Sequence, residues 1–325
     1  MRVAGFLLQW IVKALAVVLA ITILNFFLLR LAPGDPAMVM AGEAGSADQT
    51  FLDQVRHEYG LDKPLPAQLA IYVEKVFTIN LGESYRFHRP VAAMLLERLP
   101  ATLLLTGTAY AFALILGPLL GALAAMRPRS LLDRAISVLS LFFYATPIFW
   151  IGLLLILLFS VRLGWLPPFG MHGFIPPDGL LAQALDTLQH LLLPAFTLGL
   201  FYIAVYIRLT RASMLETAGL EYVKTARAKG LPEWRVATAH ILRTALLPII
   251  TFAGLQAGQL VGGALVVETV FAWPGIGRLA FDALFQRDYN LLLGVFLLSS
   301  LMVVFFNMLT DVVLRLADPR VGARA

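Results

Sequence analysis

Six apolar blocks alternate with polar segments along the 325-residue chain, and each block is about long enough to cross a lipid bilayer as one helix. A helix needs about 20 residues to cross the hydrocarbon core. A continuous apolar run favours a helix over a half-buried strand, in which apolar and polar residues alternate. The pattern therefore predicts an all-α membrane protein with six transmembrane helices, at residues 10–29, 103–125, 136–159, 188–207, 246–267 and 291–314.

Composition supports a membrane location. Hydrophobic residues make up 59% of the chain and charged residues 14%, whereas a soluble domain carries about 25% charged residues. The first apolar block exceeds the roughly 7–15 residues of a signal peptide's apolar core, so we expect it to be retained as the first span. The absence of cysteine excludes disulfides, zinc–thiolate sites and a cysteine nucleophile.

The distribution of Lys and Arg predicts the orientation, because cytoplasmic loops carry an excess of these residues. With a cytoplasmic N-terminus, the cytoplasmic segments hold fourteen Lys and Arg against five acidic residues. The opposite side then holds nine against fourteen. We therefore expect both termini in the cytoplasm. Attraction to lipid headgroups accounts for the net charge of +5 without a role in nucleic-acid binding.

The first outer loop, residues 32–99, is too long for a simple connector. Short helices are predicted at 49–59 and 67–77, and an amphipathic segment at 91–99 precedes Pro100 and the second span. We interpret this loop as a small extracytoplasmic helical subdomain, with a folded cap that binds nothing as the alternative. A later outer loop is predicted to turn at residues 273–277 and to continue as a short helix over 278–285.

The cytoplasmic segment at residues 208–245 is far longer than a connection requires. Ser213-x-x-Glu216 has the spacing of a capping box. A short polar helix is predicted over 221–228; Gly230 would end it, and Pro232 would open a second helix leading into the fifth span. This helix–glycine–helix element suggests a docking surface for a soluble partner. A connector facing the headgroups is the alternative, and attachment of both ends to the bilayer argues against a DNA-reading helix-turn-helix.

Glycines four residues apart predict close helix packing in the fifth span, because they allow two backbones to approach. Gly254, Gly258 and Gly262 are in register as a helix interface, and Gly117 and Gly121 repeat the spacing in the second span. We expect kinks at the prolines inside the spans, which are Pro118, Pro147 and Pro194.

No catalytic constellation is visible, and no cofactor or metal site is expected. The chain lacks the G-x-x-x-x-G-K-[ST] phosphate loop, so energy from ATP would have to come from another chain. Ion-coupled carriers usually hold carboxylates deep in their spans, and these spans hold almost none.

Several motifs together resemble one family. They are LAPGDPA at residues 31–37, YGLDKPLPAQ at 59–68, RLPATL at 98–103, EYVKTARAKG at 221–230, ETVFAWPGIGRL at 268–279, RDY at 287–289 and DPR at 318–320. In these motifs the chain resembles the membrane permease subunits of ABC importers for dipeptides, oligopeptides and nickel. It departs from the general permease loop at Leu242 and Arg243, where that loop has Leu-Pro.

The resemblance implies a type I ABC importer permease fold. Residues 1–95 would hold the first transmembrane helix and the extracytoplasmic subdomain. Residues 96–315 would form the transmembrane domain with a coupling loop at about 213–243, and residues 316–325 a cytoplasmic tail. The resemblance assigns contact with an ATPase to Glu221, Tyr222, Thr225, Ala226, Arg227, Ala228, Lys229 and Gly230. It assigns an outer gate or turn to Glu268, Phe271, Trp273, Pro274 and Gly275.

As such a subunit, the chain would form half of a transmembrane pathway for peptides or related small solutes. The implied partners are a second homologous permease, two ATP-binding-cassette ATPases and an extracytoplasmic substrate-binding protein in the bacterial inner membrane. The alternatives are an ion-coupled carrier or channel acting without an ATPase, and a membrane scaffold that transports nothing. Peptides of different lengths, nickel complexes, glutathione and opines all remain open as substrates.

Overall fold

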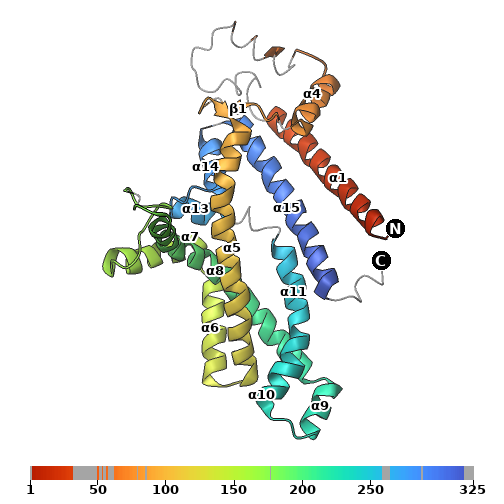
Figure 1. Cartoon of the computed structure of the whole chain (residues 1–325), viewed down its shortest axis with the longest axis vertical. Helices are drawn as coiled ribbons and strands as arrows, with labels where there is room; N and C mark the ends of the chain where they lie inside the picture. The colour runs from red at the N-terminus through yellow and green to blue at the C-terminus, as the bar shows by residue number, and fades with distance from the viewer. Residues whose placement is uncertain are drawn as a thin grey trace. The chain divides into compact units, whose positions relative to one another are not determined.

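The computed structural model describes residues 2–31, 50, 53, 56–57, 62–78, 80–84, 86–175, 177–257, 264–286 and 288–317. These residues are mostly helical, as the apolar pattern predicts (Figure 1). They divide into two compact units. The first contains residues 1–102 and 274–308, and the second contains residues 103–273 and 309–325.

In the first unit, α1 (Arg2–Leu31) packs against α4 (Leu65–Phe77). The ring centroids of Phe26 and Tyr72 lie 6.0 Å apart at this contact. Helix α4 confirms the helix predicted over 67–77. The helix predicted over 49–59 falls largely outside the described residues.

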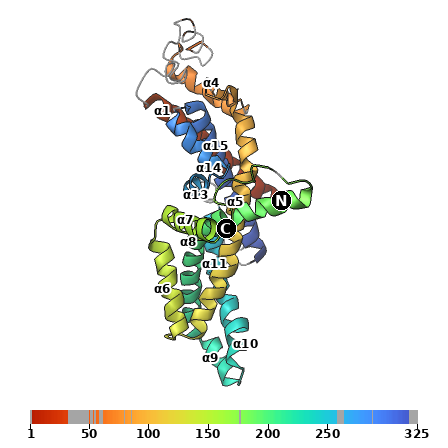
Figure 2. The same ribbon diagram turned by 90° about the vertical axis from the view of Figure 1, so that its left-hand side faces the viewer.

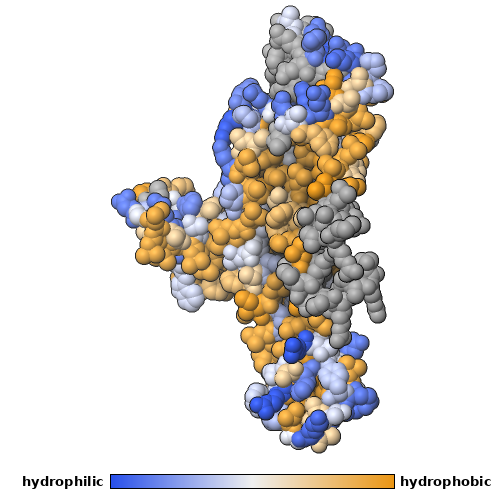
Figure 3. Space-filling model, turned by 45° about the vertical axis from the view of Figure 1, so that its right-hand side comes forward, coloured by the Kyte–Doolittle hydropathy of each residue, from blue (hydrophilic) through white to orange (hydrophobic). Residues whose placement is uncertain are grey.

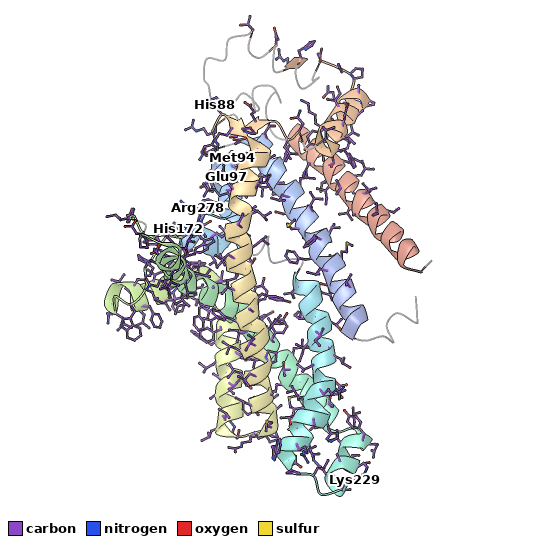
Figure 4. All side chains as sticks on the ribbon, in the orientation of Figure 1. His88, Met94, Glu97, His172, Lys229 and Arg278 are labelled. Carbon is purple, nitrogen blue, oxygen red and sulfur yellow. The ribbon has the colours of Figure 1, made fainter. Side chains whose placement is uncertain are left out.

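A two-stranded hairpin joins β1 (Glu83–Ser84) to β2 (Arg89–Pro90) in antiparallel register. Its turn includes His88 at φ 49°, labelled in Figure 4. The all-α expectation missed this hairpin, because strands of two residues leave no alternating pattern to detect.

The hairpin is tied to the start of α15 (Tyr289–Ala317). Ser84 Oγ donates to the buried carboxylate of Asp288, and Asn290 Nδ2 donates to the carbonyl oxygen of Glu83 at 3.1 Å. Asp288 Oδ1 also accepts the backbone N–H of Leu291 at 3.1 Å, and so satisfies a free donor in the first turn of α15.

Helix α5 (Val91–Met126) runs without interruption through Pro100. The segment at 91–99 and the second span therefore belong to one helix. Helix α14 (Ile276–Phe285) confirms the short helix predicted after the outer turn. The backbone N–H of Ile276, at the start of α14, donates to Thr102 Oγ1 on α5 at 2.7 Å.

The second unit contains a broken apolar helix where one span with a kink at Pro147 was predicted. Helix α6 (Leu131–Ala145) is followed by α7 (Ile148–Leu155) and by a π-helix, η1 (Ile156–Arg162). The two halves meet at 107°. Thr146 is extended, at φ −83° and ψ 134°, because Pro147 disfavours the helical conformation in the residue before it.

The other two intraspan prolines interrupt nothing. Pro118 lies within α5, and Pro194 lies within α8 (Leu180–Ala218). Helix α8 is longer than the predicted span at 188–207, and it includes Ser213 and Glu216. The capping-box prediction is therefore wrong, because Ser213 is inside a helix and its Oγ donates to the carbonyl oxygen of Ala245 at 3.3 Å.

The rest of the second unit follows the predicted helix–glycine–helix order (Figures 1 and 2). Its elements are α9 (Glu221–Ala228), α10 (Glu233–Arg235), η2 (Val236–Leu242), α11 (Arg243–Ala257) and α13 (Leu265–Val270). The continuous helix from 233 to 256 begins earlier than the predicted fifth span at 246–267, and residues 258–263 lie outside the described part of the chain.

Four described helices are long and apolar enough to cross a membrane. They cover Val91–Met126, Leu180–Ala218, Glu233–Gln256 and Asn290–Thr310. The bent pair Leu131–Ala145 and Ile148–Arg162 adds a fifth if it counts as one span. The first predicted span lies within α1, whose apolar stretch at Ala14–Phe27 is shorter among the residues described. The total of six spans stays a prediction.

Candidate functional site

Helix α9 is a short helix with clear boundaries. Leu220 precedes it in an extended conformation, at φ −73° and ψ 150°, and Glu221 places an acidic side chain in its first turn, where the helix dipole favours negative charge. At the other end, the N–H of Gly230 donates to the carbonyl oxygen of Arg227 at 2.9 Å. Gly230 has φ +76°, a left-handed conformation that glycine adopts without a steric penalty.

The backbone conformation of residue 230, and not a lack of space around it, explains why glycine occupies this position. In the described part of the chain, no heavy atom lies within 4 Å of the position that a Cβ of residue 230 would occupy. A larger residue would therefore fit, but it would have to adopt the left-handed conformation. Pro232 then precedes α10 as the N-terminal flanking residue, and the chain turns back toward the apolar helices.

One face of α9, which carries Val223 and Ala226, is buried in the chain's own core. Val223 and Ala226 pack in one cluster with residues from α5, α8, η2 and α11. Those residues are Ala122, Met214, Val236, Ile241 and Ala245. Because these contacts are apolar and shielded from water, they hold the short helix against the ends of the long ones.

The opposite face of α9 is exposed and rich in charge. Lys224 Nζ contacts Glu221 Oε1 at 2.7 Å, and Arg227 Nε contacts Glu233 Oε1 at 2.9 Å across the Gly230 turn. Lys229, at the tip of this element, is exposed. Hydrophilic side chains gather at the end of the second unit that carries α9 and α10 (Figure 3). This face suits a soluble, polar partner.

The predicted coupling residues thus lie on one short element, but they do not all face outward. Ala226 is buried, and Thr225, Ala228 and Lys229 are exposed. Tyr222 is 42% exposed, and its hydroxyl points back to its own chain.

The hydroxyl of Tyr222 lies 2.9 Å from Thr244 Oγ1 and 3.2 Å from the carbonyl oxygen of His240. Both acceptors follow the Gly230 turn, near the junction of η2 and α11. The sequence motif gave no signal for this contact, because the partners are separated by about twenty residues and a turn of unknown geometry.

A second polar connection, also missed from the sequence, joins α6 to α8. Arg211 donates from Nε to Asp133 Oδ1 at 2.6 Å and from Nη2 to Asp133 Oδ2 at 3.0 Å. Asp133 also accepts the backbone N–H of Arg129 at 2.8 Å, and its own N–H donates to Ser130 Oγ at 3.1 Å. The Ser130-x-x-Asp133 spacing was a usable signal for the start of α6.

Close helix packing is visible at the glycines that the structure describes. A Cβ on Gly254 would lie 1.9 Å from Thr310 Cγ2, and Thr310 Oγ1 donates to the carbonyl oxygen of Gly254 at 2.9 Å. Gly258 and Gly262 lie outside the described residues. A Cβ on Gly117 would lie 2.4 Å from Tyr206 Cβ, and one on Gly121 would lie 2.6 Å from the carbonyl oxygen of Ile207, so α5 and α8 are in close contact.

The residues assigned to an outer gate or turn are mainly buried. Glu268, Phe271 and Trp273 are each exposed by no more than 1%. The N–H of Trp273 donates to the carbonyl oxygen of Glu268 at 2.8 Å, which closes the end of α13. Gly275 directly precedes α14, and Pro274 is half-buried. Glu268, Phe271 and Trp273 therefore belong to the interior of the second unit, in which Ala272 adopts φ +50°.

Comparison with protein families identifies the chain. Residues 117–323 match the family described as "Binding-protein-dependent transport system inner membrane component". Residues 3–106 match the N-terminal family "Binding-prot-dependent transport system membrane comp, N-term". The chain belongs to the binding-protein-dependent transport system inner membrane components. This result confirms the suspected permease family and a multi-pass membrane protein.

Curated relatives of this inner membrane component are named as peptide permeases, and the matches cover nearly the whole length of each relative. The "Di/tripeptide transport system permease protein DppB" of Pseudomonas aeruginosa (strain UCBPP-PA14) is 44% identical over 93% of this chain and 94% of that relative. The "Dipeptide transport system permease protein DppB" of Escherichia coli (strain K12) is 39% identical over 97% of this chain and 99% of that relative. A "Putative peptide transport system permease protein" of Brucella abortus (strain 2308) is 38% identical.

A solved structure confirms the fold class of this inner membrane component. A chain from "Inward facing conformations of the MetNI methionine ABC transporter" superposes with a TM-score of 0.56 at 18% identity. The match covers 69% of this chain and 96% of that one. The chain therefore has the fold of an ABC importer permease.

Proposed function

We propose that this chain is the permease subunit of an ATP-driven importer of peptides, and that α9 is its docking element for an ATPase. Membership of the inner membrane component family and the peptide permeases among its relatives support the transport role. The two-faced arrangement of α9 carries the docking role. Its apolar face, with Val223 and Ala226, is buried in the chain, while its charged face remains exposed.

A docking element that transmits force must be held firmly by its own chain and must present a surface to its partner. Burial of Val223 and Ala226 satisfies the first condition. The exposure of Thr225, Ala228 and Lys229 satisfies the second. The small side chain of Ala228 allows a partner to approach the helix closely, and Lys229 adds a charge at the tip. Binding and hydrolysis of ATP in the partner would then displace α9 and the long helices that contact it.

In this proposal the chain lines half of the pathway, and a second homologous permease lines the other half. Two ATPases bind on the cytoplasmic side, to which both termini also belong. A substrate-binding protein delivers the solute from outside. Residues 1–95 form the first span with the outer subdomain, residues 96–315 the transmembrane domain, and residues 316–325 the tail. The turn residues Glu268, Phe271, Trp273, Pro274 and Gly275 position the outer end of this domain.

The docking role is tested by charge reversal on the exposed face of α9. We expect the variant Lys224→Glu with Lys229→Glu to lose most of the ATPase that co-purifies with the assembled complex. The matched control reverses Lys63 and Arg86, two exposed cations in the first unit. Equal retention of the ATPase by both variants would place the docking surface elsewhere.

The transport role is tested by uptake in cells that lack their own peptide importers. Cells that express the complete complex should accumulate labelled dipeptide, and the accumulation should require ATP. Competition by longer peptides, glutathione and nickel complexes then defines the range of substrates. Uptake by the purified single chain without nucleotide would instead support the alternative of a carrier or channel.

A further inference from the structure

The hydroxyl of Tyr222 connects the docking helix to the helix that follows it. Its oxygen lies 2.9 Å from Thr244 Oγ1 and 3.2 Å from the carbonyl oxygen of His240. A single hydroxyl proton can be donated to either of these oxygens. Thr244 Oγ1 itself lies 3.4 Å from the same carbonyl oxygen, so three polar groups share one small network.

This network lies where a π-helix changes into an α-helix. Residues Val236–Leu242 form η2, and α11 begins at Arg243. A π-helix is wider than an α-helix, is rare, and occurs frequently at functional sites. A change from i→i+5 to i→i+4 pairing leaves one backbone carbonyl of such a segment without its helical donor. The Tyr222 hydroxyl lies within hydrogen-bond distance of the carbonyl oxygen of His240 in η2.

Most side-chain hydrogen bonds from α9 to other elements run toward the segment that follows it in the chain. Among the described residues, Tyr222 bonds toward η2 and α11, and Arg227 bonds to Glu233 on α10 at 2.9 Å. Toward α8, Arg227 Nη1 makes one long contact of 3.5 Å to the carbonyl oxygen of Ala218. The remaining contacts of α9 with α5 and α8 involve apolar side chains, which fix no direction.

Tyr222 and Arg227 lie near opposite ends of α9, so the helix is fastened at two points to the segment that leads into α11. The apolar contacts of Val223 and Ala226 already hold α9 against η2 and α11. The hydrogen bonds of Tyr222 add a directional contact to the same segment.

We propose that Tyr222 is a positioning residue that couples α9 to the π-helical start of α11, so that movement of the docked ATPase is transmitted into this membrane helix. The proposal rests on the docking role of α9 proposed above. It differs from that role in assigning Tyr222 an intrachain contact in place of direct contact with the ATPase.

The first test is Tyr222→Phe in the complete reconstituted complex, which removes the hydroxyl and keeps the ring. We expect the ATPase to co-purify at the wild-type level. The number of substrate molecules imported per ATP hydrolysed should fall about three- to tenfold, as expected for the loss of one hydrogen bond. The matched control is Thr238→Val. Among the described residues, the Thr238 hydroxyl bonds to the carbonyl oxygen of Trp234 within its own helical segment, so its loss should leave this ratio unchanged.

The second test pairs Tyr222→Phe with Thr244→Val. If both hydroxyls act through one network, the double variant should lose no more coupling than the more severe single variant. Hydrogen–deuterium exchange of residues 236–245 in the same complex should be faster in Tyr222→Phe than in the wild type. This readout concerns the intrachain contact and does not depend on where the ATPase docks.

Three results would overturn the proposal. Loss of the ATPase from Tyr222→Phe would show that the side chain contacts the partner directly. Unchanged exchange would show that the hydroxyl does not hold the π-helical segment. Faster exchange with an unchanged ratio of import to hydrolysis would show that the contact exists but transmits nothing. Failure of the docking role itself is recognised separately, by retention of the ATPase after charge reversal at Lys224 and Lys229.

Discussion

Asp133 is almost completely buried, whereas Arg211, to which it is paired, is one-third exposed; the exposed fractions of the two side chains are 4% and 32%. The pair joins the start of α6 to α8 close to the end that leads into α9. Removing one partner of the pair should therefore lower stability by an amount that depends on which partner is removed. A buried charge left without its partner costs more free energy than an exposed one.

We therefore predict that Arg211→Met destabilises the protein more than Asp133→Asn. Among the described residues, the first change leaves the buried carboxylate with the Arg129 amide and the Ser137 hydroxyl as hydrogen-bond donors. The second leaves a guanidinium that solvent can reach. The difference should be about 1–3 kcal/mol, the cost of an unsatisfied buried polar group. Thermal unfolding of the detergent-solubilised complex measures it, and a larger effect of Asp133→Asn would contradict the argument.

Contact between α11 and the end of α15 depends on the absence of a side chain at Gly254. An added methyl group would lie 1.9 Å from Thr310 Cγ2, so Gly254→Ala should separate the helices and break the hydrogen bond from Thr310 to the Gly254 carbonyl oxygen. We expect a loss of about 1–3 kcal/mol, typical of overpacking. The companion change Thr310→Ser removes the clashing methyl group but keeps the hydroxyl. It should restore much of the stability in the double variant, and an absence of rescue would refute this explanation.

Close packing of α5 on α8 predicts a different response at two glycines of the same helix. Gly117→Ala would bring a Cβ to 2.4 Å from Tyr206 Cβ and should lower the unfolding midpoint. Gly107→Ala meets no atom within 4 Å in the described part of the chain. Because alanine favours a helix over glycine by about 0.5–1 kcal/mol, Gly107→Ala should be neutral or stabilising. Equal destabilisation by both changes would exclude close packing as the cause.

The left-handed conformation of Gly230 predicts a graded response to substitution. Asparagine adopts this conformation more readily than most residues, whereas a β-branched side chain is strongly disfavoured there. Gly230→Asn should therefore keep most of the ATPase in the purified complex, and Gly230→Val should lose much of it. The left-handed conformation costs an ordinary L-residue about 1–2 kcal/mol. Since both side chains fit the open space, identical behaviour of the two variants would show that the conformation of residue 230 does not matter.

Much of the fold could be predicted from the sequence because the signals were local. Long apolar runs indicated the spans, and the bounds of α9 were predicted to the residue from its polar composition and from the Gly230 and Pro232 signals. The short helix after Gly275 was found in the same way. Hydropathy, helix ends and turns depend on residues that are neighbours in the chain, so no knowledge of tertiary packing was needed.

The sequence was not sufficient to predict whether a helix breaks at a proline. Pro100, Pro118, Pro147 and Pro194 all lie in or beside apolar runs, yet among these four the chain breaks only at Pro147. Proline removes one backbone donor wherever it occurs. Whether a helix continues through it depends on the packing of neighbouring helices, and hydropathy contains no information on that packing.

The sequence by itself determined that this chain is a helical membrane permease with a polar helix–glycine–helix element, because apolar length, charge distribution and motifs are properties of the chain alone. Tertiary structure decided which polar groups meet. Arg211 pairs with Asp133, seventy-eight positions away, and the Tyr222 hydroxyl lies within hydrogen-bond distance of the carbonyl oxygen of His240, across a turn. A side chain's partner depends on the path of the backbone between them, and that path is set only when the helices pack.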